Sequence, residues 1–130
     1  MSNWKLVNTT YLYDGTFNGL LTIVFESYSH KTLPQKIVPE EEYTQNFLDK
    51  TMYVNTNEEK AKRVFEGIHK NICYEALFNS FYAFLSDEKE KEIKILKYLC
   101  DGFDIGPKIN TMLTISYVFK VINMRKRALS

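Results

Sequence analysis

Length, composition and charge exclude several classes of protein. The chain has 130 residues, of which 45% are hydrophobic and 15% aromatic, and its formal net charge at pH 7 is +1. Such a chain can bury a sizeable core, so extended disorder is excluded. The small net charge excludes a strong overall attraction to nucleic acid or to an anionic membrane.

Cysteine usage and the N-terminal segment indicate the compartment. Cys73 and Cys100 stand among large apolar residues and are too few for a disulfide framework, so both are expected as buried, reduced thiols. The start MSNWKLVNTT has no apolar signal core, and no apolar run approaches the roughly 18 residues of a membrane span. We expect a cytoplasmic protein without membrane contact, with residues 1–8 as an extension and residues 9–130 as a single domain.

The first predicted elements are a strand and a helix joined by the segment YDGTF. Residues 9–13 predict a strand that ends at the turn Asp14-Gly15, and Thr16 is a suitable N-cap for the next helix. Gly19 interrupts this helix, and a close packing contact would explain it. Its apolar face has i, i+3, i+4 spacing and consists of Phe17, Leu20, Leu21, Val24, Phe25 and Tyr28.

The same turn and helix start also form a candidate anion site. Its residues are Gly15, Thr16 and Phe17, because the first amides of a helix attract negative groups. Simple capping is the alternative, and the residues alone leave both interpretations open.

The middle of the chain is predicted to be irregular as far as residue 50. Pro34 and Pro39 interrupt any helix, and the three carboxylates of residues 40–42 are expected as a solvated loop rather than as metal ligands. Residues 51–56 predict a second short strand. Thr56 and Glu59 then match the capping box T-x-x-E at the start of another amphipathic helix.

The second half of the chain is predicted to be helical. A helix at about residues 73–85 is expected to bury its large apolar residues at the centre of the core, and Ser86 is a candidate N-cap for the helix that follows. Gly106-Pro107 precedes one or two final helices. The order of elements predicts an α+β fold that is mainly α, with five or six short helices and a two- or three-stranded sheet near the N-terminus.

Catalytic and metal-binding patterns are not found in the sequence. His30 fits a helix C-terminus and His69 a partly buried structural position, and neither stands at metal-ligand spacing from other ligands. The i, i+4 spacing of His69 and Cys73 is more often accidental than a nucleophilic pair. The five glycines form no phosphate-binding loop. We expect no metal and no other cofactor, and the residues favour a role other than catalysis.

The C-terminal segment KVINMRKRALS carries the main local charge pattern. Its basic residues are Lys120, Arg125, Lys126 and Arg127, and no acidic residue follows Asp104. A basic helix end can bind a phosphate backbone. It can equally be a solvated terminus whose cations suit the helix dipole.

Three separated segments together resemble one bacterial family, the uncharacterised "probable DNA metabolism proteins". They are Y-x-Y-D-G-T-F from Tyr11 to Phe17, T-x-x-E-K-A-x-R-V from Thr56 to Val64, and Y-A-F-L-S from Tyr82 to Ser86, and the segment IVPEEEY (residues 37–43) also resembles the family. The resemblance implies an accessory module in DNA damage handling, encoded beside a radical SAM protein and in some bacteria fused to a uracil-DNA glycosylase-like domain. Members continue beyond the matched region, so this chain is expected to correspond to their N-terminal half.

Three functional hypotheses follow. The first is an accessory module of DNA metabolism that contacts DNA through the four basic residues above, or contacts the radical SAM protein. The second is a protein-interaction domain that docks a partner enzyme without touching DNA, using aromatic residues such as Trp4, Tyr11 and Tyr13. The third is one half of an enzyme whose site needs the second half. We expect a monomer, or a weak homodimer through the apolar residues of 109–122.

Overall fold

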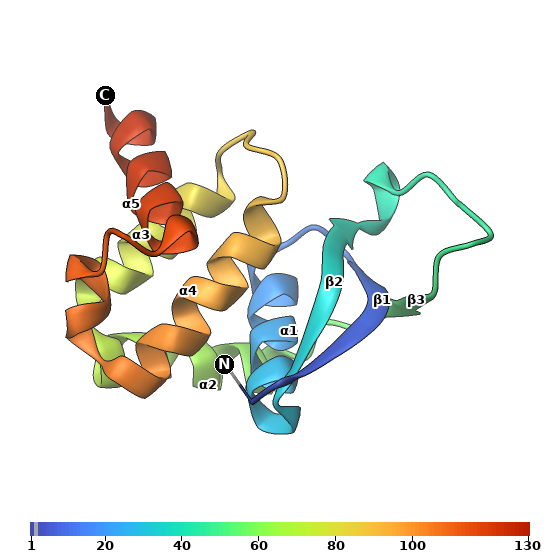
Figure 1. Ribbon diagram of the computed structural model, residues 1–130, viewed down its shortest axis with the longest axis horizontal. Helices are drawn as coiled ribbons and strands as arrows, with labels where there is room; N and C mark the ends of the chain where they lie inside the picture. Colours follow the sequence, from blue (N-terminus) through green and yellow to red (C-terminus); the bar gives the residue numbers. More distant parts are fainter. Residues whose placement is uncertain (2) are drawn as a thin grey trace. The chain divides into compact units, whose positions relative to one another are not determined.

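The computed structural model describes Met1 and residues 3–130 (Figure 1). These residues form three strands and five α-helices, which confirms the prediction of a mainly helical α+β fold with a small sheet near the N-terminus. The chain divides into two compact units, Met1–Val64 and Phe65–Ser130, and the boundary falls within helix α2 (Glu58–Gly67).

The first unit is built on a parallel sheet of strand order β2-β1-β3. The central strand β1 (Lys5–Tyr13) is followed by α1 (Phe17–His30), which leads to β2 (Thr32–Pro39). β3 (Thr51–Tyr53) pairs with the other side of β1. Both neighbours of β1 are parallel to it, so the chain must cross over between them. The segment YDGTF therefore lies at the carboxyl end of the central strand, where the sheet's connections diverge.

The sheet differs from the prediction at two places. Trp4 is buried and β1 begins at Lys5, so residues 5–8, expected in an extension, belong to the central strand. The region expected to be irregular contains β2, which includes both Pro34 and Pro39. An edge strand tolerates proline because one of its sides makes no ladder hydrogen bonds, and β2 is such a strand.

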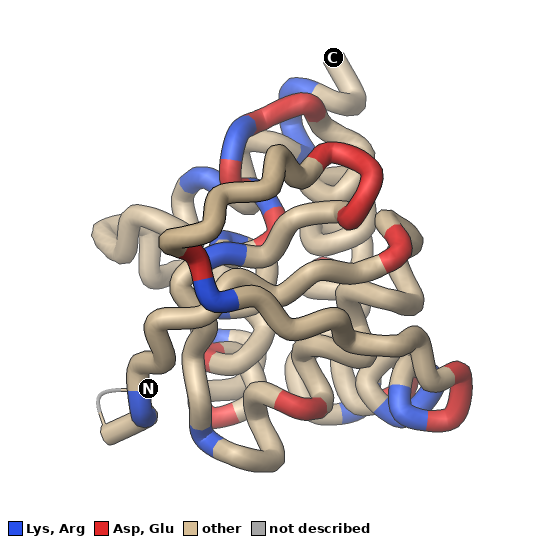
Figure 2. Tube along the Cα trace, turned by 90° about the vertical axis from the view of Figure 1, so that its right-hand side faces the viewer, with Lys and Arg blue, Asp and Glu red and all other residues tan. Residues whose placement is uncertain are grey.

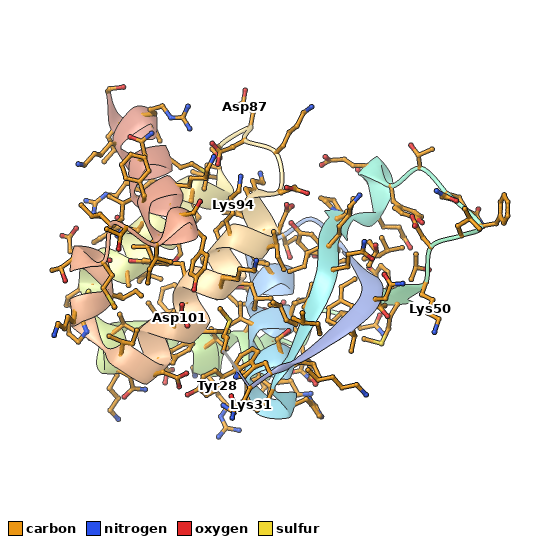
Figure 3. The ribbon with its side chains drawn as sticks, in the orientation of Figure 1. Tyr28, Lys31, Lys50, Asp87, Lys94 and Asp101 are labelled. Carbon is orange, nitrogen blue, oxygen red and sulfur yellow. The ribbon has the colours of Figure 1, made fainter. Side chains whose placement is uncertain are left out.

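The bounds and the N-cap of helix α1 follow the prediction, whereas its buried face is shifted from the predicted one and includes Ile23. The amide of Gly19 donates to Thr16 Oγ1 at 2.9 Å, so Thr16 is the N-cap as expected. The helix ends at His30, and the C-cap Lys31 adopts a left-handed conformation (φ 52°) and donates its amide hydrogen to the carbonyl of Ser27. The Lys31 ammonium lies 3.6 Å from the centre of the Tyr28 ring, and both side chains are seen at this end of the helix in Figure 3.

The second unit consists of helices. α3 (Tyr74–Phe84), α4 (Lys91–Ile105) and α5 (Ser116–Leu129) are its main elements, and α3 packs against both others (Figure 1). A π-helical turn (Ile68–Ile72) precedes α3, and a 3-10 turn (Pro107–Thr111) separates α4 from α5. In the part of the chain that the structure describes, no helix combines the length and the apolar character needed to cross a membrane.

The start of α4 lies later than predicted. Ser86 was expected to cap it, but the helix begins at Lys91 after Glu90, whose backbone is left-handed (φ 59°). The Ser86 hydroxyl instead donates to the carbonyl of Ala83 at 2.7 Å, at the end of α3.

Helix α3 is turned about its axis relative to the prediction. Its large residues were expected in the core, yet four of them are exposed: Tyr74 by 62%, Phe78 by 45%, Phe81 by 39% and Leu85, just beyond the helix, by 59%. The buried face consists of small residues, Ala76, Asn79, Ser80 and Ala83. Small side chains let neighbouring helices approach closely, which explains why this face is inside. We call the four exposed residues the α3 apolar row.

Candidate functional site

The YDGTF segment forms a hydrogen-bonded junction between two helix starts of the first unit. The Asp14 carboxylate accepts from the amide and hydroxyl of Thr16, at 3.0 and 2.7 Å, and from the hydroxyl of Thr56 at 2.6 Å. Thr22 Oγ1 on α1 accepts from the amide of Asn57 at 3.1 Å. Two segments that carry the family resemblance thus meet at one carboxylate.

The predicted capping box at Thr56 is wrong. Asn57 caps α2, because its Oδ1 accepts from the amide of Lys60 at 3.0 Å. The Thr56 hydroxyl is directed to Asp14 instead. The Thr56 hydroxyl donates to an ionised carboxylate, which is a strong type of hydrogen bond, and this long-range partner could not be read from the local pattern.

The Asp14 junction bears on the candidate anion site at Gly15, Thr16 and Phe17. Burial raises the pKa of the Asp14 carboxyl, but the hydrogen bonds from Thr56 and Thr16 outweigh it, and the pKa lies below its ordinary value of 3.8. An ionised carboxylate therefore already stands beside the first turn of α1. Its charge opposes the binding of an external anion, so the geometry favours capping at this position.

The four basic residues of the C-terminal segment lie on α5 in different environments. Arg125 forms an ion pair with Glu75, and Arg127 pairs with Glu88 at 3.2 Å. Lys120 and Lys126 are exposed, and neither has an ion-pair partner among the described residues. Near the C-terminus in Figure 2, basic and acidic positions lie close together. The structure therefore divides the predicted patch into two neutralised arginines and two solvated lysines.

Arg125 belongs to a polar network in the core of the second unit. Its Nη1 donates to Asn79 Oδ1 at 3.2 Å, and Asn79 Nδ2 donates to the hydroxyl of Tyr98 at 3.0 Å. Tyr98 donates in turn to Asn110 Oδ1, and Asn110 Nδ2 contacts Cys73 Sγ at 3.4 Å. Burial raises the pKa of the Tyr98 hydroxyl, more than the hydrogen bond from Asn79 lowers it, so Tyr98 remains a proton donor at neutral pH.

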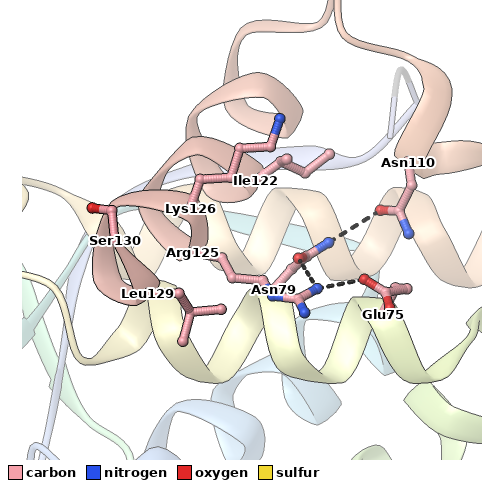
Figure 4. A pocket seen from close by; sticks show the side chains of 8 residues that line it. All are labelled: Glu75, Asn79, Asn110, Ile122, Arg125, Lys126, Leu129 and Ser130. Atoms are coloured by element: carbon pink, nitrogen blue, oxygen red, sulfur yellow. Dashed lines mark hydrogen bonds and ion pairs between the residues drawn. The ribbon is translucent and has the colours of Figure 1, made fainter.

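A groove of about 510 Å³ opens over this network, and we call it the Arg125 groove (Figure 4). Its walls combine the polar side chains of the network with two aliphatic residues and the solvated Lys126. The lining residues are Glu75, Asn79, Asn110, Ile122, Arg125, Lys126, Leu129 and Ser130. The groove can hold an anionic or amide-bearing group beside apolar atoms.

Most of the groove was not predicted from the sequence. Arg125 and Lys126 were singled out, but as part of a phosphate-binding patch. Glu75, Asn79 and Asn110 were missed, although Asn79 is an amide in the middle of an apolar helix and is buried. A buried amide must be hydrogen-bonded, so its position in the sequence was the available signal for a polar network.

Catalytic and metal-binding arrangements are not seen in the described part of the chain. No group of three or more His, Cys, Asp or Glu side chains there could hold a metal ion. His69 was expected to be partly buried but is exposed, and its ring lies 3.7 Å from that of Tyr74. Cys73 was expected to be buried but is only half-buried, and it contacts Asn110. The aromatic residues proposed for docking, Trp4, Tyr11 and Tyr13, are buried, so that part of the docking hypothesis is wrong.

Comparisons with known proteins give no relative: no protein-family model, no curated protein and no solved structure matches this chain. The family resemblance remains a prediction that rests on the three sequence segments.

Proposed function

We propose that this chain is a cytoplasmic accessory module of bacterial DNA metabolism that acts by docking a partner protein. The partner we expect is the radical SAM protein that the family resemblance implies. The observation that carries the proposal is the exposure of the α3 apolar row, whose spacing of i, i+4, i+7 and i+11 places it on one side of the helix. Tyrosine and phenylalanine are enriched in the buried cores of protein–protein interfaces.

The charge arrangement also supports a protein partner over DNA. A phosphate contact by Arg127 would have to compete with Glu88, whose side chain is only 23% exposed, and Arg125 is held by Asn79 inside a groove rather than on an open surface. Phe78 lies 5.7 Å from the Arg125 guanidinium, and arginine beside an aromatic ring is a common combination at protein interfaces.

Direct DNA contact is the second candidate, and the solvated Lys120 and Lys126 favour it. Neither lysine gives up an ion pair on binding a phosphate. In this case binding would be weak, sensitive to salt and independent of the α3 apolar row.

Calorimetric titration against the purified radical SAM protein tests the proposal. Phe78→Ala with Phe81→Ala should weaken the complex by about tenfold or more, since hot-spot residues contribute on that scale. Phe47→Ala is the matched control, because Phe47 is 92% exposed but lies in the first unit. The complex should persist at about 0.5 M salt, where screening is strong. No complex, or one that the double variant leaves unchanged, would refute this proposal.

A further inference from the structure

We infer that the Arg125 groove receives a carboxylate from an acidic segment of the partner protein, which replaces Glu75 on the Arg125 guanidinium. This inference rests on the proposed function, because it specifies the chemistry of the docked partner.

The guanidinium is held in place by hydrogen bonds that remain when Glu75 is displaced. Asn79 directs its Oδ1 to Arg125 Nη1, and the amide is fixed on its other side by donation to Tyr98 and, at 3.4 Å, to Asn110 (Figure 4). Asn79 and Tyr98 are both buried. A cation fixed in this way needs no reorganisation to bind, so more of the interaction energy appears as affinity.

The Arg125 side chain also has N–H groups that form no hydrogen bond with described residues. Both of its hydrogen bonds to described residues, with Glu75 and Asn79, come from Nη1. Nε and Nη2 donate to no described atom. Arginine binds carboxylates most strongly through two parallel N–H bonds, and this capacity is unused.

Glu75 has the properties of an exchangeable occupant. Its side chain is 64% exposed, against 24% for Arg125. An exposed carboxylate in an ion pair returns readily to water, because such pairs contribute little net free energy. A ligand carboxylate can therefore displace Glu75 while Arg125 keeps its part-buried hydrogen bond to Asn79.

The remaining walls indicate what accompanies the carboxylate. Ile122 and Leu129 offer aliphatic surface, and Lys126 adds a second positive charge at the groove. Among the described residues that line the groove none is aromatic, whereas nucleic acid bases are bound mainly by stacking on aromatic rings. This charge and surface fit a polypeptide in which acidic and aliphatic residues alternate.

Fluorescence anisotropy with a labelled synthetic peptide of alternating glutamate and leucine tests the inference. A peptide with glutamine in place of each glutamate is the matched probe. The acidic peptide should bind more tightly, and Glu75→Gln should tighten its binding by about two- to fivefold, the range expected when an exposed competing ion pair is removed. Glu88→Gln is the control, since Glu88 pairs with Arg127 and does not line the groove.

Arg125→Gln should reduce binding by about tenfold or more, and Arg127→Gln should not change it. Because Arg125→Gln also removes a partner of buried Asn79, Glu75→Gln at an exposed position is the decisive variant. NMR signals of the Arg125 Nε–H and the Asn110 amide should shift on titration. Equal binding of the two peptides, or no effect of Glu75→Gln, would overturn the inference, as would displacement of the peptide by equimolar inorganic phosphate or an oligonucleotide.

The two proposals can fail separately. If the peptide binds as expected but the radical SAM protein forms no complex, the chemistry of the groove stands and the proposed partner is refuted. If that complex forms and both Glu75→Gln and Arg125→Gln leave it unchanged, docking stands and the carboxylate inference is overturned.

Discussion

At the scale of single residues, Gly19 lies where a methyl group would meet atoms that are held in place. A Cβ there would be 2.4 Å from Asp14 Oδ1, 2.9 Å from the ring of buried Tyr13 and 3.0 Å from Thr56 Oγ1. Glycine is therefore required for the approach of Asp14 and Thr56 to α1, which is the packing contact that the sequence left open.

We expect Gly19→Ala to lower the free energy of unfolding by about 1–3 kcal/mol, the usual cost of overpacking. Ordinary helix propensity predicts the opposite sign. Gly67→Ala is the control, because a Cβ at Gly67 would meet Phe103 at 3.5 Å and Asn71 at 3.7 Å, which are ordinary contact distances. Urea denaturation measures both changes, and equal effects of the two substitutions would contradict the proposed crowding at Gly19.

Asp14 should make the first unit sensitive to acid. Its pKa is lowered in the folded state, so its stabilising contribution is present above the ordinary pKa and is lost as the pH falls through the lowered value. Asp14→Asn should cost about 1 kcal/mol at pH 7 through the weakened hydrogen bonds. The difference from wild type should shrink below about pH 4.

Thermal denaturation across this pH range checks the prediction for Asp14. Asp87→Asn serves as the control, since Asp87 is exposed and has no partner among the residues that the structure describes. A difference between wild type and Asp14→Asn that stays constant down to pH 2.5, roughly one unit below the ordinary pKa, would contradict the prediction.

At the scale of elements, substitutions at the start of α2 can distinguish the energy of the Asn57 cap from that of the hydrogen bond between Thr56 and Asp14. Asn57→Ala should cost about 1 kcal/mol as the loss of an N-cap, whereas Glu59→Ala should be nearly neutral because no capping box exists. Thr56→Ala should couple to Asp14→Ala by about 0.5 kcal/mol or more in a double-mutant cycle. Additivity of those two substitutions, measured by urea denaturation, would show that their hydrogen bond contributes nothing.

The orientation of α3 gives a prediction of its own. Phe78→Gln should cost about 1 kcal/mol or less, because it removes an exposed ring and one cation–π contact. Ala76→Leu should cost about 1–3 kcal/mol, because Ala76 is fully buried. The reverse order of these two costs would mean that the aromatic face is the inner one.

Sequence patterns predicted a helix with one apolar face better than a helix with two faces that could each be buried. α1 has a single apolar stripe and a local cap, so its bounds and its N-cap were correct. In α3 the small residues repeat with the same helical spacing as the large ones, so periodicity cannot decide which face is buried. β2 was missed because its prolines are permitted only by its place at the edge of the sheet, which is a tertiary property.

In the candidate sites, only interactions between residues close together in the sequence could be predicted. Thr16 was identified because its partner lies three residues away. The pairing of Arg125 with Glu75 joins two different helices, and nothing in the basic segment indicates it. The nucleic-acid patch was predicted from the number of basic residues alone, without the acidic residues that pair with two of them.

At the scale of the whole molecule, the ion pairs of Arg125 and Arg127 set the salt dependence of any DNA binding. If all four basic residues neutralised phosphates, the logarithm of the binding constant would fall against the logarithm of the salt concentration with a slope of about −3.6; with Lys120 and Lys126 alone the slope is about −1.8. We expect the smaller slope. Anisotropy titrations of a labelled duplex at several salt concentrations measure this slope. The double variant Lys120→Ala, Lys126→Ala should abolish binding. A slope of about −3.6 would show that the arginines leave their acidic partners.

The two edges of the sheet restrict how this molecule can associate. Unpaired strand edges generally recruit strands from other chains, which leads to aggregation or to partner binding by strand addition. Here one edge carries Pro34 and Pro39, and the other is the three-residue β3. Proline removes a backbone donor and a three-residue strand offers little backbone to pair with, so both edges are poor templates. The sheet is protected against self-association at high concentration, and recognition of a partner is left to side chains rather than to the backbone.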